Sequence, residues 1–163
     1  MKEIQLTQGK IALVDDEDYD RLIAMGKWQC SLGYATKNVK FNSIHTTLRM
    51  HRVILTKYLN LDSCNPRLVQ VDHINGNKLD NRKENLRTCS PSQNSQNRPA
   101  SKNNTSGYKG VVWHSRSKKW VAKITANGAN THLGCFDDPK LAAKAYNEAA
   151  VKLYGEFANI NQI

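Results

Sequence analysis

Apolar residues alternate with polar ones along much of the first half of the chain, and this pattern predicts short strands. Residues 1–14 contain two such runs that turn at Gln8 and Gly9. Residues 27–36 and 43–50 contain two more, separated by a polar turn over residues 36–42. Helical spacing of the apolar residues replaces the alternation in two places, residues 17–25 and 51–59. We therefore expect a β-rich amino-terminal region with two helices.

A different pattern occupies the middle of the chain, where two apolar runs flank a polar loop. The first run, residues 68–71, ends in Asp72 and His73. An Asn-Gly-Asn sequence at residues 75–77 favours a turn, because Asn and Gly tolerate positive φ angles. The second run, residues 86–89, is followed by a Ser-Pro pair, which is typical of a helix start. The pattern predicts the order strand, loop, strand, helix.

This order would bring together side chains suited to metal-dependent hydrolysis. Asp72 and His73 end the first strand, and Asn94 lies on the helix. Carboxylate and amide oxygens are ligands for a hard cation, and an imidazole can act as a general base. The alternative is that Asp72 and His73 form a hydrogen-bonded pair at a strand end, with no catalytic role.

Two other polar groups have alternative interpretations. Four consecutive acids, residues 15–18, precede the first predicted helix. We favour a helix-capping role over a metal cluster, because consecutive residues point in different directions on a helix. His51 begins the second helix and is either structural or a ligand or phosphate contact. Arg52 beside it is a candidate phosphate contact.

The pattern changes again in the last third of the chain. Residues 99–106 are polar and lack periodicity, so we expect a linker there between a first domain, residues 1–98, and a second, residues 107–163. The second domain contains three alternating runs, residues 108–113, 119–124 and 132–136. An alanine-rich helix follows an Asp-Asp-Pro start at residues 137–139. The fold class predicted for the whole chain is therefore α+β.

Charge points to a polyanionic partner. The net charge is +10, with twelve basic and four acidic residues over 27–98 and nine and four over 99–163. Residues 1–26 are acidic instead, with three basic and six acidic side chains. A basic excess over two successive segments indicates a nucleic-acid surface, although a merely soluble basic protein is the alternative.

Other compositional features exclude some classes of protein. No apolar run approaches the roughly 18 residues of a membrane helix, and the first residues lack a secretory signal. We therefore expect no membrane partner and a cytoplasmic location. If the gene belongs to a phage, this location is the cytoplasm of the host cell. Cys30, Cys64, Cys89 and Cys135 are widely spaced, with no Cys-x-x-Cys pair. A structural zinc site is therefore not expected.

The stretch from Val69 to Arg98 resembles the HNH, or ββα-metal, nucleases, particularly the small homing endonucleases of phages and introns. The resemblance rests on Asp72-His73, Asn85 and Asn94 at their spacing. It implies a ββα core over residues 68–98. His73 would be the general base and Asp72 and Asn94 the metal ligands, while Asn85 would hold the loop and orient the imidazole.

The second domain resembles the plant ethylene-response-factor (APETALA-type) DNA-binding domain. The matching segments are residues 107–111, 120–124, 133–136, 142–146, 149–150 and 157–161. This family places its open sheet face in the major groove. By position, the residues expected to face DNA are Lys109, Trp113 or His114, Arg116, Lys118 or Lys119, Lys123, Thr125 and His132. In the nuclease domain, Arg52 and Arg87 are also expected to contact DNA.

Together these patterns predict a metal-dependent DNA endonuclease that is targeted by its carboxy-terminal domain. It would use one Mg²⁺ or Mn²⁺ ion per site, act as a monomer or weak dimer on duplex DNA, and leave 5′-phosphate and 3′-hydroxyl ends. One active site per chain would nick one strand. The alternatives are a catalytically inactive DNA-binding regulator on the same scaffold and an RNA-processing protein, for which no aromatic stacking platform is evident.

Overall fold

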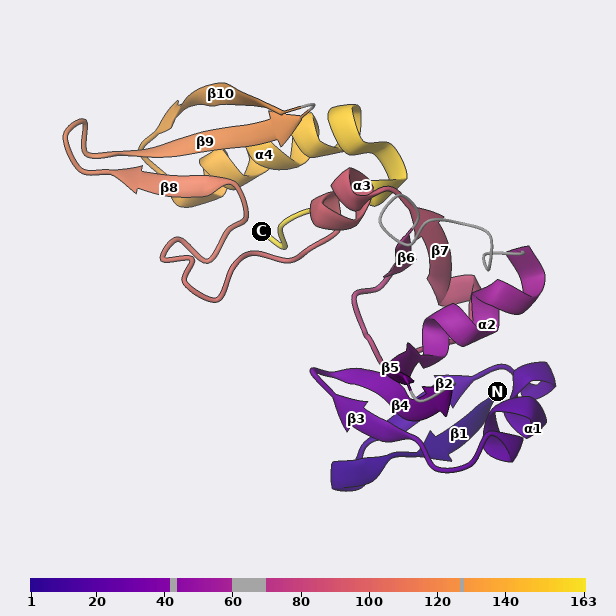
Figure 1. The fold of residues 1–163 in the computed structure, drawn as a ribbon. Coiled ribbons are helices and arrows are strands. Elements are labelled where there is room, and N and C mark those ends of the chain that lie inside the picture. The colour runs from indigo at the N-terminus through magenta and orange to yellow at the C-terminus, as the bar shows by residue number, and fades with distance from the viewer. Residues whose placement is uncertain (42–43, 60–69, 127) are drawn as a thin grey trace. The chain divides into compact units, whose positions relative to one another are not determined.

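The computed structural model describes residues 1–41, 44–59, 70–126 and 128–163. Its fold is mixed α+β, as predicted, and its residues form two compact units, Met1–Pro91 and Ser92–Ile163 (Figure 1). The predicted linker, residues 99–106, lies within the second unit, and a domain boundary there stays a prediction. Within the described residues, no helix has the length and apolar character needed to cross a membrane.

The amino-terminal hairpin of the first unit forms as the alternation predicts. Strands β1 (Lys2–Gln5) and β2 (Ile11–Val14) pair antiparallel around a single 3-10 turn, Thr7–Gly9. Helix α1 (Asp16–Ala24) follows at once. Its acids do more than complement the helix dipole, because Asp15 Oδ2 accepts a hydrogen bond from the backbone N–H of Lys83 at 2.8 Å. The acidic segment therefore also attaches α1 to a loop that lies far away in the sequence.

The next sheet differs from the prediction in its turns. It has the order β3-β4-β5, with β3 at Gln29–Ser31, β4 at Tyr34–Phe41 and β5 at Ile44–Arg49. The strand predicted over residues 27–36 is broken by a tight turn in which Leu32 and Gly33 have φ angles of 51° and 81°. The turn predicted over residues 36–42 lies mostly inside β4. Polar residues fit this strand because one of its faces is exposed to solvent.

Helix α2 (Met50–Leu59) and the hairpin of β6 (Gln70–His73) and β7 (Leu86–Cys89) complete the first unit. The hairpin is antiparallel, and a 3-10 turn, Lys83–Asn85, precedes β7. Residues 68 and 69, where the first strand was expected to begin, lie outside the described residues. Elements of the whole unit share one hydrophobic core. Its most buried large side chains include Trp28, Leu22, Met50 and Ile54.

The second unit contains the predicted three-stranded sheet and helix. The strands β8 (Val111–His114), β9 (Lys119–Ala126) and β10 (Ala129–Phe136) are antiparallel in the order β10-β9-β8. Helix α4 (Pro139–Tyr154) covers one face of this sheet (Figure 1). The short helix α3 (Pro91–Gln96) follows β7 in the chain, which completes the predicted order strand, loop, strand, helix.

Small side chains let α4 approach its sheet closely. Ala142 and Ala143 pack with Val111 and Ala122, and Tyr146 and Ala150 pack with Ile124, in two clusters of buried residues. The Asp138 side chain caps the helix by accepting from the backbone N–H of Lys140 at 2.8 Å. One sheet face is thereby buried and the other is left open to solvent.

Candidate active site and nucleic-acid face

The end of β6 delivers two of the predicted catalytic residues into a mostly buried position. Asp72 and His73 are 7% and 4% exposed, and they pair in register with Arg87 and Leu86 of β7. Consecutive strand residues point to opposite faces, so Asp72 and His73 have different neighbours. The hairpin therefore gives each of them a separate environment.

Among the described residues, Asn81, His51 and Tyr34 lie beside the His73 imidazole. Its Nε2 lies 3.4 Å from Asn81 Oδ1. The ring of His51 meets it edge to face with centroids 4.8 Å apart, and the ring of Tyr34 lies 6.1 Å away. His51 was expected to be structural or a second ligand, and the structure places it directly against His73. Asn81 and Tyr34 were not found by sequence reasoning, because they lie on other segments of the chain.

The buried cluster affects both histidines. Burial lowers the pKa of His73, while the acceptor Asn81 and the carboxylates of Asp72 and Asp80 oppose part of this effect. The pKa of His51 falls to about 3, mainly through burial and also through His73 and two nearby arginines. His51 is therefore neutral near pH 7. Its Nδ1 is buried and has no hydrogen-bond partner among the residues that the structure describes, and such an unpaired group costs on the order of 1–3 kcal/mol.

Arg87, which was expected to contact DNA, forms an ion pair with Asp72 in the structure, and the DNA contact stays a prediction. Its guanidinium donates to Asp72 Oδ2 from Nε at 3.1 Å and from Nη2 at 3.0 Å, and both side chains are mostly buried. The two residues are cross-strand neighbours in the β6–β7 ladder. Arg87 thus compensates the charge of the carboxylate that was predicted to hold a metal ion.

Asn85 holds the loop, as expected, but it does so through the backbone. Its Oδ1 accepts from Asn75 N at 2.9 Å and its Nδ2 donates to the carbonyl of Asp80 at 2.8 Å. Both ends of the amide are therefore used by the loop. The amide that lies beside the imidazole belongs to Asn81, and an orienting role of Asn85 toward His73 stays a prediction.

Asp80 stabilises the same loop. It binds Arg82 in a two-pronged ion pair, with N–O distances of 2.8 Å and 2.7 Å, and accepts from Asn75 Nδ2 at 3.0 Å. The Arg82 guanidinium holds the pKa of this carboxyl below its usual range. Sequence reasoning missed Asp80, Asn81 and Arg82, although three polar residues in a row beside the turn were a visible signal.

Asp72 offers the kind of donor atom that a divalent ion binds. Asp72 supplies a carboxylate, and Mg²⁺ binds through one or two carboxylates while keeping waters and substrate phosphates as its other ligands. Among residues with a described placement, no cluster of three His, Cys, Asp or Glu side chains could form a metal cage. The second predicted ligand, Asn94, lies on α3 in the other unit, so its joint action with Asp72 stays a prediction.

The β4–β5 hairpin adds a basic surface to the first unit. Lys40 pairs in register with His45, and Asn38 pairs with Thr47, so these four exposed residues share one face of the hairpin. Arg49 extends the same face, and its guanidinium carbon lies 4.9 Å from the centroid of the Tyr34 ring. The face therefore begins at the tyrosine that contacts His73.

The open face of the second unit contains part of the predicted DNA-binding set. Register places His114, Lys119, Lys123, Thr125 and His132 on the face opposite α4. Lys119 also binds Asp137, at 2.6 Å. Arg116 and Lys118 are exposed in the turn between β8 and β9.

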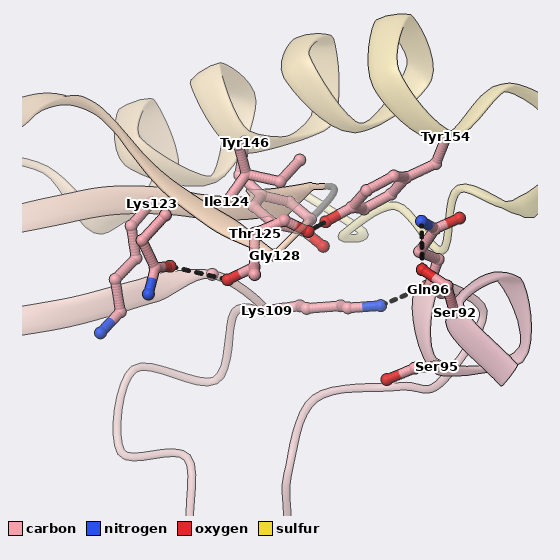
Figure 2. A pocket seen from close by; sticks show the side chains of 12 residues that line it. Ser92, Ser95, Gln96, Lys109, Lys123, Ile124, Thr125, Gly128, Tyr146 and Tyr154 are labelled. Carbon is pink, nitrogen blue, oxygen red and sulfur yellow. Dashed lines mark hydrogen bonds between the residues drawn. The ribbon is translucent and has the colours of Figure 1, made fainter.

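Trp113 and Lys109, which were also expected to face DNA, contact other parts of the second unit in the structure. Trp113 pairs with Trp120, and their rings meet at 5.0 Å on the face that α4 covers. Lys109 donates from Nζ to the carbonyls of Gln96 and Arg98, and burial lowers its pKa to about 8. Figure 2 shows its side chain directed toward Gln96, at a pocket of about 350 Å³ within the second unit. Of the pair Trp113 and His114, only His114 lies on the open face, and Lys109 is engaged by the chain itself.

Comparison with known proteins agrees with the central motif. A model of the HNH endonuclease family matches residues 65–96. Protein 3.8 of Escherichia phage T7 is 36% identical over 93 residues, which are 57% of this chain and 76% of that protein. An HNH endonuclease of Acanthamoeba polyphaga mimivirus is 37% identical over 116 residues, 71% of this chain and 58% of that protein.

A second group of relatives comes from plants. The AP2-like ethylene-responsive transcription factor TOE2 of Arabidopsis thaliana is 41% identical over 71 residues, 44% of this chain but only 14% of that protein. No solved structure matches the chain significantly. This chain therefore belongs to the HNH endonuclease family and contains, in addition, a region similar to the AP2-like factors of plants.

Proposed function

We propose that this protein is a metal-dependent DNA endonuclease of the homing type, in which His73 is the general base and Asp72 and Asn94 are metal ligands. The observation that carries the proposal is the placement of His73, in a buried cluster beside Asp72, within the segment that matches the family. An imidazole with a lowered pKa is neutral near pH 7 and can accept a proton.

In the proposed reaction, His73 takes a proton from water, whose oxygen attacks the phosphorus of a phosphodiester. The bond to the 3′-oxygen then breaks, and this oxygen takes up a proton from solvent, so that the products carry 5′-phosphate and 3′-hydroxyl ends. A bound Mg²⁺ or Mn²⁺ ion would neutralise the charge that accumulates on the phosphate and the departing oxygen. Asn85 and the Asp80–Arg82 pair hold the loop that follows His73 in a fixed conformation.

Two surfaces would bind the substrate. The basic face of the β4–β5 hairpin offers Lys40, His45 and Arg49, and it adjoins the His73 cluster through Tyr34. On the carboxy-terminal sheet, Lys123, Thr125 and His132 lie on the open face. Lysine contributes a point charge rather than a two-pronged bond to guanine, so we expect phosphate contacts to dominate affinity there.

A supercoiled-plasmid assay tests the proposal. The wild-type protein with Mg²⁺ or Mn²⁺ should convert the plasmid to the nicked form, and His73→Ala should reduce the rate at least about 100-fold while still shifting DNA on a gel. Lys144→Gln serves as a control, because Lys144 is exposed on α4, which packs on the other face of the sheet from the proposed DNA-binding residues. If wild type and His73→Ala leave the plasmid equally intact while both bind DNA, the protein is a DNA-binding regulator instead.

A further inference from the structure

The His73 imidazole has a polar neighbour whose orientation is determined by the surrounding backbone. Asn81 is 1% exposed, and its Nδ2 donates to the carbonyl of Leu79 at 3.1 Å. A carbonyl only accepts hydrogen bonds, so the amide nitrogen must face Leu79. The amide oxygen, Oδ1, therefore faces His73 Nε2, at 3.4 Å.

The backbone that carries Asn81 is fixed to the core. Asn81 N donates to the carbonyl of Leu13 at 2.8 Å, and Leu13 N donates to the carbonyl of Leu79 at 2.8 Å. Leu13 belongs to β2, whose neighbouring residues Ala12 and Val14 are fully buried. The loop segment is thus attached to a strand on both sides of Asp80, so Oδ1 has little freedom to leave the imidazole.

An acceptor at this place determines the tautomer of His73. Neutral imidazole has one protonated nitrogen and one with a lone pair. Asn81 Oδ1 has no proton to give, so it interacts favourably only with a protonated Nε2. The lone pair then lies on Nδ1. The distance of 3.4 Å is long for a hydrogen bond, but such bonds shorten when charge develops on the base.

We propose that Asn81 is a positioning residue, which holds His73 as the Nε2–H tautomer and thereby makes Nδ1 the nitrogen that accepts the proton from water. The catalytic part of this proposal rests on the proposed nuclease function, whereas the tautomer does not. When Nδ1 takes the proton, the imidazole becomes an imidazolium, and the bond from Nε2–H to Asn81 becomes charge-assisted and stronger. Asn81 would therefore stabilise the protonated base without touching the substrate.

The test combines a spectroscopic measurement with kinetics on the full chain. Long-range ¹H–¹⁵N correlation spectra of protein labelled at histidine report the tautomer of each neutral imidazole, and His73→Ala identifies the His73 signals. We expect the Nε2–H form in the wild type and a mixture of forms in Asn81→Leu, which lacks the acceptor. Asn81→Asp keeps an oxygen at this position and should retain the Nε2–H form.

The kinetic expectation follows from the tautomer. Asn81→Leu should lower kcat for plasmid nicking about 10- to 100-fold, the range seen when groups that orient a functional histidine are removed, with little change in KM. Asn81→Asp should recover part of this loss. Asn77→Ala provides a matched control, because Asn77 lies exposed in the same loop and its side chain accepts from Leu79 N rather than facing His73.

Each outcome decides a separate point. A wild-type His73 protonated on Nδ1 overturns the proposal, and this measurement needs no variant, so a failure of Asn81→Leu to fold does not prevent the decision. A folded Asn81→Leu protein with an unchanged tautomer and kcat also overturns it. If the wild type shows the Nε2–H form but never nicks DNA with either metal ion, the proposed nuclease function fails while the structural assignment of Asn81 stands.

Discussion

The ion pair between Asp72 and Arg87 is the residue-scale feature with the clearest functional consequence. Both side chains are mostly buried, and a buried carboxylate is stable only when its charge is compensated. If a divalent metal ion binds Asp72, two cations, the ion and the Arg87 guanidinium, share one carboxylate. Arg87 would then stabilise the metal-free protein and limit its affinity for the ion.

This balance leads to a prediction for Arg87→Gln. Without metal, the variant should be less stable than wild type by about 3–5 kcal/mol, because it removes the positive charge that Arg87 holds against the buried Asp72 carboxylate. Millimolar Mn²⁺ should restore much of this stability, since the ion replaces the lost charge. Thermal unfolding with and without Mn²⁺ measures both effects.

The matched control is Arg82→Gln, which breaks the equivalent pair with Asp80 on the neighbouring loop. Asp80 is not a proposed ligand, so this variant should lose stability without recovering it in Mn²⁺. Equal recovery in the two variants, or none in Arg87→Gln, would argue against Asp72 as a metal ligand.

At the scale of secondary-structure elements, the packing of α4 on its sheet depends on one glycine. Gly110 has a φ of +75°, and a Cβ placed there would lie 2.0 Å from Tyr146 Cδ2 and 2.8 Å from the carbonyl oxygen of Lys123. Its own carbonyl accepts from Lys123 N at 2.8 Å. The residue before β8 therefore lies in contact with both the helix and the neighbouring strand.

We accordingly expect Gly110→Ala to destabilise the carboxy-terminal sheet and helix. The left-handed backbone and the overlap with Tyr146 should together cost about 3 kcal/mol or more in the free energy of unfolding. Gly128→Ala is the control, because its φ of +78° is similar but nothing lies within 4 Å of the added carbon. Chemical denaturation should show that the free energy of unfolding of the control falls by about 1 kcal/mol. A Gly110→Ala protein as stable as Gly128→Ala would contradict this packing.

At the scale of the whole molecule, the charge distribution determines how the protein should bind DNA. The net charge is +10, and the two basic segments carry the proposed active site and the open sheet face. Binding driven by phosphate contacts releases counterions from the DNA, so the affinity for DNA should fall steeply as the salt concentration rises.

Lysine substitutions can assign this salt dependence to a surface. Measured in an inactive His73→Ala background, Lys123→Gln should reduce the slope of log K against log salt by about 1, because one phosphate contact is lost. Lys144→Gln removes the same charge from α4, on the other side of the sheet, and should leave the slope unchanged. Fluorescence anisotropy with duplex DNA measures the slopes. Equal slopes for the His73→Ala protein and for its Lys123→Gln and Lys144→Gln derivatives would show that the open sheet face is not part of the DNA-binding surface.

Element order was predictable from the sequence wherever neighbouring residues decide the structure. The alternating runs ending at His73 and Cys89, the Ser-Pro helix start and the three strands before α4 all formed as expected. The turn at Leu32 and Gly33 was missed, because Leu-Gly lacks the Asn or Asp that usually marks a tight hairpin turn. Once that turn was missed, β4 was also placed wrongly.

The strand–loop–strand–helix motif with Asp72 and His73, the sheet-and-helix region and the basic charge could all be predicted without a structure, because the order of residues along single segments and the composition of the chain specify them. The groups that contact the imidazole and the carboxylate became known only from the folded arrangement of the chain. Asn81, His51 and Tyr34 meet His73, and Arg87 meets Asp72, through loop conformation, strand register and core packing. These contacts depend on how separate segments pack together, and no residue pattern along one segment specifies them.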